Sequence, residues 1–93
     1  MIERANLGDA SELSRLENEV FDKFNCPLSK RSFIYHARKN LLLIFRRNGE
    51  ILGYILVFAY LNVPRIYSLA VSPKARGKGI GKALLAAVTA KFD

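Results

Sequence analysis

Three glycines in alternate positions, Gly77, Gly79 and Gly81, lie between a short apolar run and a run with helical spacing. Glycine lets the backbone approach a ligand closely and take positive φ angles. The free N–H groups in the first turn of a helix, together with the helix dipole, favour an anion. Basic residues flank the glycines: Lys74, Arg76, Lys78 and Lys82. This spacing predicts a loop that binds a phosphate group.

Two common phosphate-binding motifs do not fit the loop. A P-loop requires Gly at position 76 and Ser or Thr at position 83, where the chain has Arg76 and Ala83. A dinucleotide fingerprint requires a third glycine at 82 or 84, where the chain has Lys82 and Leu84. The pattern that fits is Arg/Gln-x-x-Gly-x-Gly/Ala, which residues 76–81 match shortly after a predicted strand. The residues alone leave open a glycine-rich connection with solvated lysines.

The segment SLAVSPKARGKGIGKALL resembles the acetyl-CoA-binding motif of the GNAT N-acetyltransferase superfamily. The resemblance implies that acetyl-CoA is a co-substrate and that no metal is required. It implies that main-chain groups of Val71 hold the pantetheine and that the amides of residues 77–82 hold the diphosphate. The cofactor-binding residues would be Leu69, Ala70, Val71, Arg76, Gly77, Lys78, Gly79, Ile80, Gly81 and Lys82.

Acyl transfer to an amine requires a bound thioester, a polarised carbonyl and a deprotonated amine. The resemblance implies that the N–H of Leu69 is the oxyanion donor. The base is not apparent, because Asp and Glu are absent from residues 51–92. Strand alternation places Tyr67 on the face of Leu69 and Val71, where it lines the amine site or packs on the sheet. His36 is expected to be a surface or capping residue.

The run from Asn18 through Phe33 is similar to the branch of the family that acetylates the N-terminal alanine of ribosomal proteins. The similarity implies a primary-amine acceptor, either a protein N-terminus or a small amine. Its binding residues would be Phe24, Asn25, Pro27 and Tyr67. The same aromatic residues would equally serve to close the core, so this assignment stays open. Direct transfer makes Cys26 unnecessary as an acyl carrier.

Composition bounds the remaining alternatives. The 93 residues form one domain at most, and about half of them are hydrophobic, which indicates a packed core. The formal net charge of +7 admits nucleic-acid binding, but the basic residues are scattered without an aromatic-interleaved stripe. The chain shows no membrane span, no signal-peptide pattern and a single cysteine, which together indicate a cytoplasmic protein.

The first third of the chain predicts a strand and two helices. Residues 1–6 alternate weakly and predict a short strand. Asp9 is a good helix N-cap with Glu12 at the third position, and an apolar stripe predicts a helix over residues 10–24. Ser29 can cap a second, shorter helix, and Asn40 would end that helix in a left-handed conformation.

Strands and one further helix follow. Residues 41–45 form an apolar strand, and Asn48-Gly49 predicts a hairpin turn. Residues 50–60 return as a longer strand, in which Gly53 indicates a bulge or a close contact. Residues 66–71 predict another strand, bounded by prolines, and helical spacing begins at Ile80.

The resulting order is β-α-α-β-β-β-α, an α/β (α+β) fold with a mixed sheet and helices on both faces. It is similar to the first part of a GNAT domain, so residues 1–93 would be a partial acyl-CoA-binding domain without its C-terminal strand-helix-strand-strand part. The strand at 65–71 would then be an exposed edge through which the chain forms a homodimer. The function expected is N-acetyl transfer; the alternatives are a CoA-binding module without turnover and a basic nucleic-acid-binding domain.

Overall fold

The computed structural model describes residues 1–21, 27–58 and 63–92. Two short 3-10 helices, η1 (Leu7–Asp9) and η3 (Pro73–Ala75), accompany the regular elements. In chain order these elements are β1 (Ile2–Arg4), α1 (Ala10–Val20), α2 (Lys30–Lys39), β2 (Leu41–Arg47), β3 (Glu50–Phe58), β4 (Arg65–Val71) and α3 (Ile80–Phe92). The order β-α-α-β-β-β-α is confirmed.

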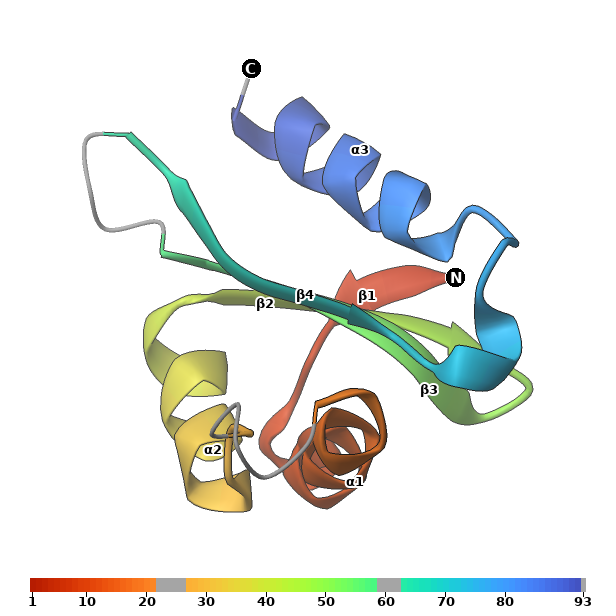
Figure 1. Ribbon diagram of the computed structural model, residues 1–93. Coiled ribbons are helices and arrows are strands. Elements are labelled where there is room, and N and C mark those ends of the chain that lie inside the picture. Colours follow the sequence, from red (N-terminus) through yellow and green to blue (C-terminus); the bar gives the residue numbers. More distant parts are fainter. Residues whose placement is uncertain (22–26, 59–62, 93) are drawn as a thin grey trace.

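The four strands form one sheet in the order β1-β2-β3-β4, and every neighbouring pair is antiparallel. Helices α1 and α2 cover one face of the sheet, and α3 covers the other (Figure 1). β4 is therefore an edge strand in the described part of the chain, as predicted. No helix among the described residues is both long and apolar enough to cross a bilayer.

The sheet separates two apolar cores because side chains of a strand alternate between its faces. Residues 51–57 of β3 are all buried, since both faces of this strand are covered. One core lies under α1 and α2 and contains Phe33, Leu42, Ile44, Tyr54 and Leu56, among others. The other lies under α3 and contains Leu41, Leu43, Ile55, Val57 and Leu84, among others.

The hairpin between β2 and β3 confirms the predicted turn, because Asn48 and Gly49 both have positive φ, 53° and 78°. The register then shifts between Phe45 and Arg46, which leaves Leu52 as an extra residue beside Gly53. A Cβ atom on Gly53 would lie 3.0 Å from the carbonyl oxygen of Ala70. The bulge and the close contact expected at Gly53 are thus both present.

Two predictions about helix ends are wrong, and a third is confirmed only in position. Helix α1 ends at Val20 instead of residue 24, because Phe21 is already extended. Asp9 is the N-cap residue of α1, as predicted, but its side chain makes no capping bond. Asn40 is extended and not left-handed, because β2 begins directly after it. The Ser29 cap of α2 is confirmed, since its hydroxyl accepts a hydrogen bond from the Ser32 N–H at 3.2 Å.

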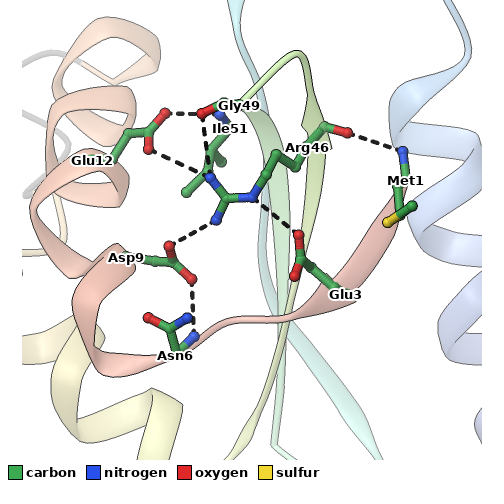
Figure 2. A network of polar contacts seen from close by, with 8 residues as sticks. All are labelled: Met1, Glu3, Asn6, Asp9, Glu12, Arg46, Gly49 and Ile51. Atoms are coloured by element: carbon green, nitrogen blue, oxygen red, sulfur yellow. Dashed lines mark hydrogen bonds and ion pairs between the residues drawn. The ribbon is translucent and has the colours of Figure 1, made fainter.

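Asp9 is engaged by Arg46, whose guanidinium joins four segments of the chain (Figure 2). Arg46 Nη2 donates to Asp9 Oδ1 at 2.7 Å and Nε donates to Glu3 Oε1 at 3.0 Å. Glu12, the expected capping partner, lies 3.9 Å from Arg46 Nη1 and accepts from the N–H of Ile51 at 2.8 Å. These bonds to Asp9 and then Glu3 raise the pKa of Arg46. Arg46 is therefore a tie between β1, η1, α1 and the β2–β3 hairpin.

Replacing Arg46 by Lys should lower the free energy of unfolding by about 1 to 2 kcal/mol, because an ammonium cannot reproduce the fork of donors. Arg47→Lys is the matched control, since Arg47 is exposed and lies over the ring of Phe45. Its effect should stay within about 0.5 kcal/mol. Urea denaturation of both variants measures the difference, and equal effects would contradict the role given to Arg46.

Candidate functional site

The glycine-rich loop leads directly into α3. Ala83 donates the first helical hydrogen bond, to the carbonyl of Gly79 at 2.9 Å. The N–H groups of Ile80, Gly81 and Lys82 therefore have no acceptor four residues back inside the helix. They are available to an anion at the start of α3, as the sequence predicts.

Gly77 and Gly79 have φ of 81° and 78°, a conformation that other residues rarely adopt. A Cβ atom on either would meet no atom within 4 Å. Both glycines are therefore required by the backbone and not by crowding within the chain, and the space beside them is open. Gly81 differs, because its Cβ would contact the Val71 side chain at 3.6 Å. Gly81 thus faces the edge strand.

The basic residues of the loop separate into two groups. Lys74 forms an ion pair with Glu50, and this hydrogen bond raises the pKa of Lys74. Arg76, Lys78 and Lys82 are exposed and form no ion pair with any acidic residue in the described ranges. Three cations beside the free amides are thus left for an anionic ligand.

The hydrogen-bond pattern at the end of β4 determines which main-chain groups face the free edge. The N–H of Ser72 donates to the carbonyl of Leu52 at 2.8 Å. Bonded positions alternate along an antiparallel pair, so Ala70 and Ser68 also turn their N–H groups toward β3. Leu69 and Val71 turn theirs toward the free edge of the sheet. The two residues expected to bind the thioester and the pantetheine therefore present main-chain donors at an open edge.

The predicted face of Tyr67 is wrong. The register of β4 shifts between Ile66, opposite Val57, and Ser68, opposite Leu56, so that Tyr67 is an extra residue in a bulge. A bulge interrupts the alternation of side chains. Tyr67 consequently stacks on Phe58 at 4.8 Å, on the face covered by α1 and α2, whereas Leu69 and Val71 pack toward α3.

His36 lies in a group of rings with Tyr35, Phe58 and Tyr67. Its ring centre is 5.7 Å from that of Phe58 and 6.2 Å from that of Tyr67. Its Nδ1 accepts a hydrogen bond from the Asn40 side-chain amide at 2.9 Å. Burial lowers the pKa of His36, which keeps the imidazole neutral at pH 7. His36 is thus part of the aromatic wall beside the β4 bulge.

A buried carboxylate, which the sequence reasoning missed, lies behind this wall. Glu17 is only 3% exposed. Its Oε1 accepts from the Tyr54 hydroxyl at 2.5 Å and its Oε2 accepts from the Leu28 N–H at 2.8 Å. The Tyr54 hydroxyl also lies 2.8 Å from Ser68 Oγ. One signal was present in the sequence: Glu17 lies four residues after Leu13, on the apolar face of its helix.

Burial, followed by the hydrogen bond to Glu17, raises the pKa of Tyr54. The ring of Phe33 meets the ring of Tyr54 edge to face at 5.3 Å, which fixes the tyrosine. Tyr54 therefore stays protonated and connects α1 with β4.

The expected acceptor-binding residues are only partly described. Phe24 and Asn25 lie outside the described residues. Pro27 is half-buried and precedes Leu28, whose N–H bonds to Glu17. The structure therefore brings the start of the segment at Pro27 to the same hydrogen-bond network that reaches Ser68, next to Tyr67.

The chain belongs to the GNAT acetyltransferase family, since the model of the acetyltransferase (GNAT) domain matches residues 9–93. The predicted family is thereby confirmed. A comparison with curated protein sequences found no match.

Solved structures share the fold at low sequence identity. The ribosomal-protein-S18-alanine N-acetyltransferase from Escherichia coli gives a TM-score of 0.85 at 20% identity, over 98% of this chain and 57% of that one. PaiA N-acetyltransferase from Thermoplasma acidophilum, in complex with coenzyme A, gives a TM-score of 0.84 at 17% identity, over 96% of this chain and 69% of that one. The GphF GNAT-like decarboxylase, in complex with isobutyryl-CoA, gives a TM-score of 0.84 at 17% identity, over 97% of this chain and 57% of that one. This chain thus spans little more than half the length of the first of these proteins.

Proposed function

We propose that this chain is the part of an N-acetyltransferase that binds acetyl-CoA and transfers the acetyl group directly to a primary amine. The observation that carries the proposal is the corner between β4 and α3. There, the free N–H groups at the start of α3 adjoin the outward N–H groups of Leu69 and Val71. The diphosphate of CoA requires donors such as the helix amides, and the adjoining pantetheine arm requires donors such as the strand amides.

The residues at this corner fit the chemistry of acetyl-CoA. The amides from Gly77 to Lys82 would hold the diphosphate, and Arg76, Lys78 and Lys82 would neutralise its charge. Val71 would bond the pantetheine amides in the manner of a neighbouring strand. Leu69 would place its N–H against the thioester oxygen, where negative charge develops during transfer.

The acceptor amine would approach from the face covered by α1 and α2. The β4 bulge turns Tyr67 to that face, beside Phe58 and the neutral His36. An electron-rich aromatic surface attracts an ammonium group. A protein N-terminus is the acceptor that we propose first, in keeping with the ribosomal-protein-alanine branch. Small amines are the alternative class.

A second candidate is a module that binds CoA without turnover. The described part of β4 and the strand before it contain no acidic side chain beyond Glu50, so no direct base adjoins Leu69. One structure with the same fold is named a decarboxylase, so the fold by itself does not fix the reaction.

Replacing Gly79 by Leu should abolish acetyl-CoA binding, because its side chain would enter the open space beside the amides. Gly49→Leu is a matched control: both glycines have φ of 78°, and a Cβ added at either would have no atom within 4 Å. The two variants share a backbone strain of about 1 to 2 kcal/mol. Isothermal titration calorimetry with acetyl-CoA separates them, and equal affinity in both variants would contradict the diphosphate site.

Incubation with acetyl-CoA should release CoA thiol only when a primary amine is added. A thiol reagent measures the release with three acceptors: a peptide beginning with alanine, the same peptide with an acetylated N-terminus, and a polyamine. Release with the free peptide alone supports a protein N-terminus as the acceptor. Binding of acetyl-CoA without release from any acceptor would instead favour the module without turnover.

The outward main-chain groups of β4 also support the proposed homodimer, since an edge strand can pair with a second copy. Pantetheine would then compete with the second copy for Leu69 and Val71. Light scattering should show a concentration-dependent dimer that becomes a monomer when CoA is added. A monomer at every concentration without CoA would contradict pairing through residues 65–71.

A further inference from the structure

The hydroxyl groups of Ser68 and Tyr54 connect the middle of β4 to the buried carboxylate of Glu17. Ser68 Oγ lies 2.8 Å from the Tyr54 hydroxyl, which donates to Glu17 Oε1 at 2.5 Å. Because Tyr54 gives its proton to the carboxylate, its oxygen is the acceptor for the Ser68 hydroxyl. The Ser68 oxygen then retains lone pairs for another donor. Ser68 is the partly exposed member of the three residues, whereas Tyr54 and Glu17 are buried.

On the basis of the proposed function, we propose that Ser68, Tyr54 and Glu17 form a proton relay that removes one proton from the acceptor ammonium. Ser68 touches the amine and is the catalytic residue. Tyr54 and Glu17 act through Ser68 and are positioning residues that receive the proton. The relay supplies the base that acyl transfer requires, because no acidic side chain of β3 or β4 adjoins Leu69.

The position of Ser68 fits this role. It directly precedes Leu69, whose N–H faces the free edge of the sheet. Its side chain points to the α1 and α2 face, where the bulge also places Tyr67. An acyl carbon held at the Leu69 N–H would therefore have the Ser68 hydroxyl on the side from which the acceptor comes.

The proton balance is complete. One ammonium proton passes to Ser68 Oγ while the Ser68 proton passes to the Tyr54 oxygen and the Tyr54 proton passes to Glu17. The amine lone pair then forms the C–N bond as the C–S bond breaks. The second proton of the amine leaves with sulfur, which gives the CoA thiol. Glu17 afterwards returns its proton along the same hydroxyls to solvent.

The surroundings of the relay favour neutral hydroxyls. The raised pKa of Tyr54 keeps its hydroxyl protonated at the beginning and end of each turnover. The titratable groups that face the relay are Tyr67 beside Ser68 on β4 and His36 from α2, next to Tyr67. From α1, only Glu17 bonds to Tyr54 among the described residues. No cation is bonded to Glu17 there, and its second oxygen accepts from the Leu28 N–H.

The decisive variant is Ser68→Ala, with Ser68→Thr as its conservative partner. In Ser68→Ala, the rate of thiol release with an alanine-terminated peptide should fall roughly 10²-fold or more. Its rate should also keep rising with pH up to the pKa of the peptide amine, about 8, because only free amine then reacts. The rate of thiol release by the unchanged chain should reach its plateau at a lower pH. Ser68→Thr should restore both this rate and this pH profile. Glu17→Gln and Tyr54→Phe should match Ser68→Ala, with thermal unfolding monitored for each.

Calorimetry with acetyl-CoA on the same samples separates the two proposals. Failure of the unchanged chain to bind acetyl-CoA overturns the proposed function and the relay with it. Binding without thiol release overturns the relay and leaves the CoA site. Release by Ser68→Ala at the original rate, or at a lower rate with the original pH profile, also overturns the relay. The relay is supported if Ser68→Ala binds acetyl-CoA normally but loses the plateau in the pH profile of thiol release, and if Ser68→Thr restores that plateau.

Discussion

The candidate site depends on the register of β3 and β4, which decides which residues of β4 direct their N–H groups toward β3 and which direct them outward. The bond from Ser72 to Leu52 fixes the alternation, so the N–H groups of Leu69 and Val71 face outward. A slip of one residue would turn them inward and expose those of Ser68 and Ala70 instead. Gly53 is compatible with this register, because it lets β4 and the start of α3 approach β3 closely. The same glycine thus aligns the outward amides with those of the loop.

A buried carboxylate such as Glu17 is costly unless its oxygens are hydrogen-bonded. Here each oxygen has a donor, from Tyr54 and from the Leu28 N–H. The network therefore ties together α1, the segment before α2, β3 and β4. Glu17 and Tyr54 alone would join α1 to β3, and Ser68, the partly exposed member of the three, extends the network to β4. This third member is what makes the network a candidate for proton transfer.

The sequence patterns predicted those features that depend on short-range chemistry. Apolar periodicity located the strands and α3, Asn48 and Gly49 located the hairpin, and the glycine spacing located the loop. Long-range partners were beyond that reasoning, because Asp9 is engaged by Arg46 and Glu17 by Tyr54, each 37 residues away. The side on which Tyr67 lies depends on one extra residue in β4, which simple alternation does not anticipate.

The three exposed cations of the glycine-rich loop lie apart from the side of β4 at which we propose that the acceptor binds. Ser68 precedes Val71 by three residues, about 10 Å at the usual strand rise, and the free cations follow that point. Arg65 lies a similar distance in the other direction. At physiological salt, exposed charges beyond about 8 Å are largely screened. The proposed acceptor would therefore meet Tyr67, Phe58 and the neutral His36 at a distance from the basic loop.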